Sequence, residues 1–177
     1  RNANELIHNA VDYMVGMGYM NGMDASHFGP NLELNRAMMV TILYRIAGSP
    51  AVAADSTFSD VPADEFYTDP VAWAVENGIT NGVSASLFAP GKPLTRQELV
   101  TFLYRFAGVM GYDRTATTDL SGYTDANQIQ PFANEAFAWA VAEGVIKGTS
   151  DTTLSPAATT TRAQVCLMVY RLLSAQD

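Results

Sequence analysis

The sequence predicts a mainly α-helical domain built from three pseudo-symmetric helix–loop–helix repeats that pack around one shared core. The first observation is a fifteen-residue stretch that occurs three times, as LNRAMMVTILYRIAG, LTRQELVTFLYRFAG and TTRAQVCLMVYRLLS, starting at residues 34, 94 and 160. The second is that apolar residues in each copy recur at helical spacing and form one wide apolar face. The two helices of one unit can cover only part of their apolar faces. The three units are therefore expected to pack together into one domain and not to fold as independent domains.

Each copy begins with the signals of a helix N-terminus. Thr95 and Thr161 stand at the N-cap position, and Glu98 and Gln164 follow three residues later, which is the spacing of a capping box. Asn35 can cap the first copy, but no Glu or Gln completes the box there. The three stretches are therefore expected to be helical from their first turn.

The residue after each cap is an arginine, namely Arg36, Arg96 or Arg162. The first turn of a helix carries the positive end of the helix dipole and usually favours acidic residues. A cation in this place in all three copies indicates an anionic partner, which is either a ligand or an acid from a neighbouring repeat.

The rest of each unit precedes its arginine at fixed offsets, and the arginines are 60 and 66 residues apart. First helices are expected in ELIHNAVDYMVGMG, PVAWAVENG and PFANEAFAWAVAEG, each ended by a glycine that can take the left-handed conformation. A loop containing proline connects them to the capped helices. The repeats span 5–48, 58–108 and 123–175, the linkers span 49–57 and 109–122, and the paired glycines are Gly18 and Gly22, Gly78 and Gly82, and Gly144 and Gly148.

Composition indicates a folded globular chain, with 48% hydrophobic and 16% charged residues. The net charge of -8 and the lack of a basic stripe argue against nucleic-acid binding. An anionic ligand would have to be held by local arginines and not by the overall field. No apolar run approaches the roughly 20 residues that span a bilayer, so membrane insertion is not expected.

The sequence also offers no recognisable catalytic or metal-binding motif. His8 and His27 have no histidine or cysteine partner at metal-ligand spacing. There is no nucleophile elbow, catalytic acid pair or phosphate loop, so we expect neither a cofactor nor an enzyme. Cys166 takes the place of Val40 and Val100 in the repeat and is expected to be buried.

The repeats resemble S-layer homology (SLH) modules, which anchor bacterial surface-layer proteins and cell-surface enzymes. The resemblance rests on FSDV and YTDA at residues 58 and 123, on AWAVENGITNG and AWAVAEGVIKG, and on FAPGKPLTRQE and LSPAATTTRAQ. It implies three prongs around a central helical bundle and an extracellular location at the cell wall. It also implies non-covalent binding of a secondary cell-wall polysaccharide, often one carrying pyruvylated N-acetylmannosamine, in grooves between the prongs.

The resemblance assigns ligand contacts to the matching positions. A pyruvate ketal presents a carboxylate that suits arginine, and helix N-terminal amides beside the arginine would add to the attraction. Tryptophan can stack on a sugar, and aspartate can accept hydrogen bonds from sugar hydroxyls. Repeat one lacks the FxD opening, so one or two competent grooves are expected and not three. The implied ligand-binding residues are Asp60, Trp73, Gly82 and Arg96 in repeat two, Asp125, Trp139, Gly148 and Arg162 in repeat three, and Tyr13 and Arg36 in repeat one.

Each of these residue types also has a structural explanation. The first-turn arginines can pair with acids of a neighbouring repeat, the aromatic residues can belong to the core, the aspartates can cap a turn, and the glycines can serve the backbone. Arg45, Arg105 and Arg171 lie near helix C-termini, where cations are favoured, and are expected to be structural.

The chain begins without methionine, so we expect a monomeric fragment of a longer secreted protein whose cargo domains lie elsewhere. The alternative to a wall-polysaccharide anchor is a protein–protein interaction or self-assembly module of a surface-layer protein. Competition by purified wall polymer would separate the two.

Overall fold

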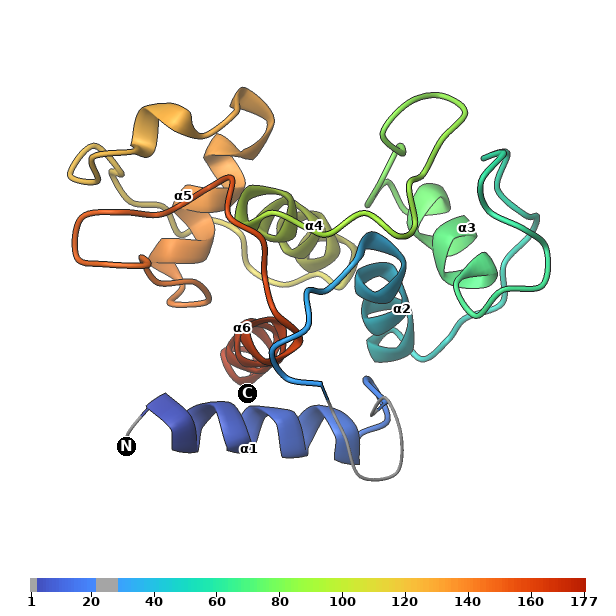
Figure 1. Ribbon diagram of the computed structural model, residues 1–177, viewed down its shortest axis with the longest axis horizontal. Helices are drawn as coiled ribbons and strands as arrows, with labels where there is room; N and C mark the ends of the chain where they lie inside the picture. The colour runs from blue at the N-terminus through green and yellow to red at the C-terminus, as the bar shows by residue number, and fades with distance from the viewer. Residues whose placement is uncertain (1–2, 22–28) are drawn as a thin grey trace.

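The computed structural model describes residues 3–21 and 29–177. Gly22 and His27, which the sequence analysis named, lie outside these residues. The described residues form helices and no β-strand, as the fold-class prediction expected (Figure 1). The helices are α1 (Ala3–Gly16), α2 (Arg36–Ile46), α3 (Thr68–Glu76), α4 (Arg96–Val109), α5 (Asn134–Ala142) and α6 (Arg162–Ser174), with short 3-10 helices η1 (Ala126–Gln128) and η2 (Pro131–Ala133).

The caps that the sequence predicts are present at α2, α4 and α6. Thr95 accepts a hydrogen bond from the Glu98 amide while Glu98 accepts from the Thr95 amide, and Thr161 and Gln164 form the same reciprocal pair. Asn35 accepts from the amide of the third helical residue without a return bond. These caps set the point at which each arginine enters the first turn.

The most extensive helix contacts join consecutive repeats. Helix α2 packs against α3, α4 packs against α5, and α6 returns to pack against α1 (Figure 1). The helix–loop–helix unit of the sequence is therefore not the packing unit. In each pair an aromatic ring of the first helix meets, edge to face, a tyrosine of the capped helix that precedes it in this cycle. The ring centroids are 5.7 Å apart for Trp73 and Tyr44, 5.5 Å for Trp139 and Tyr104, and 5.1 Å for Tyr13 and Tyr170.

A closed cycle of backbone hydrogen bonds holds the three repeats together just before the capped helices. The Leu34 amide donates to the Thr160 carbonyl (2.9 Å), the Thr160 amide to the Leu94 carbonyl (3.1 Å), and the Leu94 amide to the Leu34 carbonyl (3.0 Å). All three residues are fully buried, so these bonds satisfy polar groups that water cannot reach. The three repeats are thus joined in one ring.

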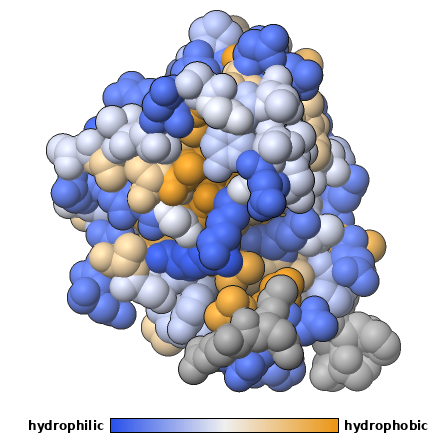
Figure 2. Space-filling view, turned by 90° about the vertical axis from the view of Figure 1, so that its left-hand side faces the viewer, coloured by the Kyte–Doolittle hydropathy of each residue, from blue (hydrophilic) through white to orange (hydrophobic). Residues whose placement is uncertain are grey.

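One hydrophobic core receives side chains from all three repeats. Helices α2, α4 and α6 lie toward the middle of the molecule and α1, α3 and α5 lie outside them (Figure 1). On the face shown in Figure 2, hydrophobic residues are visible mainly near the centre, inside a largely hydrophilic surround.

Cys166 is fully buried, as predicted, and burial raises the pKa of its thiol to about 12. Among the described helices, none has both the length and the apolar character needed to cross a bilayer.

Candidate functional site

The three first-turn arginines connect each repeat to the next. Arg36 Nε donates to the Phe88 carbonyl (2.7 Å), and Arg96 Nε donates to the Leu154 carbonyl (2.8 Å). Arg162 closes the cycle, since its Nη2 donates to the Asn21 carbonyl in repeat one. Each arginine of one repeat thus holds the loop of the next one around the ring.

These guanidinium groups are almost completely buried, with 5–6% of each residue exposed. Burial lowers the pKa of the Arg36 guanidinium, and the carboxylate of Glu98, 3.4 Å from Arg36 Nη1, opposes that shift. Burial likewise lowers the pKa of Arg96, and the charge of Asp125 opposes it. The structural explanation, an acid from a neighbouring repeat, holds for Arg36, but carbonyl oxygens are the partners that Arg36, Arg96 and Arg162 share.

The helix N-termini do not offer free amides to an anion, contrary to the sequence-based expectation. The Arg36 and Arg96 amides donate to the Lys92 and Ala158 carbonyls, and the Arg162 amide donates to the Leu32 carbonyl. The amide of the second helical residue is also bonded to the neighbouring repeat, and the third is bonded to the cap. Contacts between repeats therefore use the donors that an anion would need.

The two aspartates of the FxD and YTDA segments fasten the loop of their own repeat. Asp60 accepts hydrogen bonds from the amides of Phe88 and Ala89 at 2.9 and 2.8 Å. Asp125 accepts from the amides of Leu154 and Ser155, both at 2.9 Å. Burial would raise the pKa of Asp125, but hydrogen bonds from these two amides and from its own backbone amide, together with the charge of Arg96, hold the pKa below its usual value.

The same loop residues carry the carbonyl groups that the arginines bind. The Phe88 amide donates to the Asp60 carboxylate, and the Phe88 carbonyl accepts from Arg36. Leu154 makes the same two bonds, with Asp125 and Arg96. The backbone turns sharply after each of them, with φ of 59° at Ala89. The aspartates therefore fit the turn-capping alternative, and their place as sugar-hydroxyl acceptors stays a prediction.

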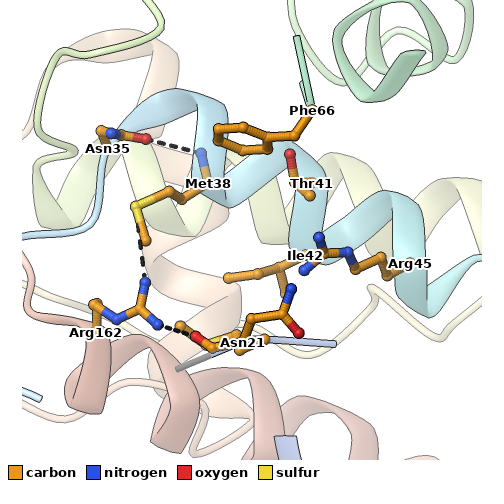
Figure 3. Close-up of a pocket in the computed structure, with 9 residues that line it drawn as sticks. Asn21, Asn35, Met38, Thr41, Ile42, Arg45, Phe66 and Arg162 are labelled. Carbon is orange, nitrogen blue, oxygen red and sulfur yellow. Dashed lines mark hydrogen bonds between the residues drawn. The ribbon is translucent and has the colours of Figure 1, made fainter. Parts of the chain in front are cut away.

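Two open cavities lie where the repeats meet. The first, termed groove 1, has a volume of about 420 Å³ and is lined by Met20, Asn21, Asn35, Met38, Thr41, Ile42, Arg45, Phe66 and Arg162 (Figure 3). The second, termed groove 2, has a volume of about 380 Å³ and is lined by Arg36, Thr80, Asn81, Gly82, Val83, Lys92, Glu98, Thr101, Phe102, Arg105 and Phe132.

The two grooves are equivalent by the internal repeat. Asn21, Thr41 and Arg45 of groove 1 correspond to Asn81, Thr101 and Arg105 of groove 2, each 60 residues later. Each groove takes a buried arginine from one repeat, a loop and helix from the next, and an exposed phenylalanine from the third. A single repeat therefore cannot form a groove.

Positive charge is concentrated in these grooves although the chain carries a net charge of -8. Groove 1 has Arg45 and Arg162 and no carboxylate among its described lining residues. Groove 2 has two arginines and Lys92 against the single carboxylate of Glu98. Both grooves are suited to an anionic ligand of limited size.

The aromatic residues expected to stack on sugar lie in the core. Trp73 and Trp139 are 4% and 1% exposed, and Tyr13 of α1 is half-buried against Tyr170 of α6. A sugar cannot lie on a ring face that neighbouring side chains cover, so burial argues against a stacking role for the two tryptophans. The exposed rings at the grooves are Phe66 and Phe132, which are 59% and 53% exposed and which the sequence analysis did not single out.

Gly82 and Gly148 stand where a side chain has no room. A Cβ on Gly82 would lie 2.5 Å from Phe58 Cε1 and 2.7 Å from the Leu87 carbonyl oxygen, and Gly82 also has φ of +83°. A Cβ on Gly148 would lie 2.7 Å from the Thr153 carbonyl oxygen. Both glycines are thus required by the backbone, and Gly82 also lines groove 2.

The structure regroups the residues that the sequence analysis assigned repeat by repeat. Arg36 of repeat one shares groove 2 with Gly82 of repeat two. Arg96 instead reaches repeat three, where its Nη2 donates to the Lys147 carbonyl (2.6 Å), next to Gly148. Arg96 was grouped with Gly82, yet it lines neither groove. Residues of one repeat therefore belong to different contacts between repeats, because each first-turn arginine donates to a carbonyl of the following repeat, and their roles at a ligand stay predictions.

Sequence signals existed for the residues that were missed. Phe66 and Phe132 each precede a tryptophan by seven residues, and Arg45 and Arg105 end the same LYR triplet. The sequence analysis predicts a structural role for these arginines because they lie near helix C-termini. That Arg45 and Arg105 face the same cavities as the first-turn arginines follows only from packing between repeats.

Comparison with known families gives a match to the S-layer homology domain over residues 57–100 and 122–166, about half of the chain. These two segments cover most of the second and third repeats. Residues before 57 lie outside the match.

Similar proteins include bacterial surface-layer proteins and an anchoring protein. The surface-layer 125 kDa protein of Lysinibacillus sphaericus is 37% identical over 95% of this chain and 14% of its own length. The S-layer protein sap of Bacillus anthracis is 35% identical over 58% of this chain and 12% of its own, and the cellulosome-anchoring protein of Acetivibrio thermocellus is 25% identical over 88% and 35%. The chain thus spans a minor part of each relative.

Proposed function

This chain belongs to the S-layer homology domain family, and we propose that it anchors a larger secreted protein to the bacterial cell wall by binding a secondary cell-wall polysaccharide. The family and the surface-layer relatives indicate a cell-surface module at the extracellular face of the wall. The polysaccharide, the anchored cargo and the absence of catalysis are parts of the proposal.

The observation that supports the proposal most strongly is the pair of equivalent, positively charged grooves on an acidic chain. Each groove combines arginines, asparagine and threonine side chains and an exposed phenylalanine. An acidic sugar presents a carboxylate, hydroxyl groups and an apolar ring face, and these groups match that set. We propose a pyruvylated N-acetylmannosamine unit as the ligand, as the family resemblance implies.

The proposed ligand contacts follow the geometry of the grooves. Arg36 with Gly82 in groove 2, and Arg162 in groove 1, keep a place at the ligand, while Phe66 and Phe132 take the stacking role first assigned to Trp73 and Trp139. Arg96 and Gly148 lie together where repeat two meets repeat three and stay proposed contacts there, with Asp60 and Asp125 holding the loops in place. Tyr13 is assigned to the contact between α1 and α6.

We further propose that residues 5–48 are a third, divergent copy of the SLH repeat. Three repeat-specific features support this: Leu34 completes the ring of backbone hydrogen bonds, Arg36 binds the next loop as Arg96 does, and Tyr13 pairs with Tyr170 as each tryptophan pairs with its tyrosine. The three copies would form a single domain over residues 1–177.

Calorimetric titration with a synthetic pyruvylated N-acetylmannosamine glycan, beside the same glycan without pyruvate, tests the proposal. We expect heat from the pyruvylated glycan only, with at most one ligand per competent groove. Binding to neither glycan, nor to purified wall polymer, would contradict the carbohydrate function. Concentration-dependent self-association in sedimentation would then favour the self-assembly alternative.

A further inference from the structure

Groove 2 contains two arginines whose surroundings differ. Arg36 is 5% exposed, and three of its five N–H donors have partners: the Phe88 carbonyl, Glu98 (3.4 Å) and Thr80 (3.5 Å). Its guanidinium carbon also lies 4.8 Å from the centroid of the Phe88 ring and 5.5 Å from that of Phe102. Arg36 is therefore built into the wall of the groove.

Arg105 lines the same groove but donates fewer hydrogen bonds than Arg36. It is half-buried, and its Nη1 donates to the Ile79 carbonyl at 3.1 Å, which ties the side chain to the loop that follows α3. That bond occupies one of five N–H donors. Thr101 and Phe102 precede it on the same helix and line the same groove, and the exposed Lys92 adds a second accessible cation.

Groove 1 repeats this arrangement. Arg45 is half-buried and lines the groove, and its Nη1 donates to the Tyr19 carbonyl at 3.4 Å. Tyr19 corresponds to Ile79 in the repeat. Figure 3 shows Arg45 and Arg162 on opposite sides of the cavity, with Ile42 and Asn21 between them. Each of the two grooves thus combines a half-buried arginine, held by one hydrogen bond to a backbone carbonyl, with a first-turn arginine.

We propose that Arg45 and Arg105 are the residues that bind the carboxylate of the ligand, and that the first-turn arginines chiefly connect the repeats. This inference rests on the proposed carbohydrate function and names the contact that gives it acid specificity. A half-buried guanidinium with free donors can form the paired, parallel hydrogen bonds that a carboxylate accepts. It loses less hydration on binding than a point charge on lysine would.

The test measures binding of the pyruvylated glycan to the wild-type chain, to the pair Arg45→Gln with Arg105→Gln, and to Arg114→Gln. Arg114 is an exposed arginine that stacks on Tyr104 outside both grooves, so its variant controls for loss of positive charge. We expect the pair to bind at least about tenfold more weakly and with a smaller salt dependence, while Arg114→Gln binds within about twofold of wild type.

A folded pair variant with unchanged affinity would overturn the inference while leaving the carbohydrate function in place. Absence of binding by the wild type would overturn both. If the pair variant does not fold, as judged by circular dichroism, the pair Arg45→Lys with Arg105→Lys keeps the charge and decides instead. We expect it to bind about three- to tenfold more weakly because lysine cannot form the two parallel hydrogen bonds, and unchanged affinity would refute the assignment.

Discussion

Replacing Gly82 by alanine should destabilise the fold much more than replacing Gly78, although both glycines have positive φ. The φ angles are +83° and +71°, and a residue with a Cβ loses roughly 1 kcal/mol in this region. Around Gly78 the added Cβ meets nothing within 4 Å, so Gly78→Ala should cost only that strain, about 1 kcal/mol.

At Gly82 the same Cβ would lie 2.5 Å from Phe58 Cε1 and 2.7 Å from the Leu87 carbonyl oxygen. The ring can turn but the backbone carbonyl cannot easily move, since it accepts hydrogen bonds from the amides of Val83 and Ser84. Overpacking of this kind adds roughly 1–3 kcal/mol, so Gly82→Ala should cost about 3 kcal/mol in all.

Thermal unfolding followed by circular dichroism compares the two variants. At about 3 °C per kcal/mol for a chain of this size, Gly78→Ala should lower Tm by about 3 °C and Gly82→Ala by about 9 °C. Equal shifts would refute the reasoning, because they would mean that the close approach between Gly82 and its loop contributes nothing.

Three further predictions follow. Asp125→Asn should lower the free energy of unfolding by about 2 kcal/mol at pH 7. Because the pKa of Asp125 is depressed in the folded state, the difference in urea midpoint between wild type and variant should shrink as the pH falls below 3.8 toward that depressed pKa. A difference that does not change with pH would contradict this. Glu98→Gln should keep the capping box, as Gln164 does in α6. It should raise the affinity for the acidic glycan about fivefold, because it removes the negative charge from groove 2. Weaker binding in calorimetric titration would instead indicate that Glu98 contacts the ligand. Single-tryptophan variants made by Trp73→Phe or Trp139→Phe should show coincident fluorescence and circular-dichroism transitions in urea, because one core joins the repeats; separated transitions would contradict a shared core.

Local rules predicted the local structure well. The caps at Thr95 and Thr161 and the left-handed Gly78 and Gly144 depend on a few neighbouring residues, and all are present in the structure. The burial of Cys166 followed from its place in the repeated apolar face. These features could be read from the sequence because their causes lie within one helix or one turn.

The residue groups around the grooves could not be predicted in the same way. The sequence places Arg96 and Gly82 in the same repeat, whereas in the structure each first-turn arginine contacts the repeat that follows its own. A tryptophan in an alanine-rich helix is compatible with either a core or a binding surface, and Trp73 is buried because its ring packs against Tyr44 of α2 and Phe106 of α4. The features that the sequence could not predict therefore lie at contacts between repeats, where spacing along the chain carries little information.

The contact of each first-turn arginine with the following repeat explains why a cation recurs in the first turn of three helices. The amides that would attract an acid there are bonded to carbonyl groups of the neighbouring repeat, and the arginine beside them binds a further carbonyl of that repeat. The unfavourable position relative to the helix dipole is offset by these buried hydrogen bonds. Because the same interface forms the grooves, ligand binding and the closure of the ring depend on one set of contacts. Loss of any one repeat should then remove grooves 1 and 2 together, since each takes residues from all three.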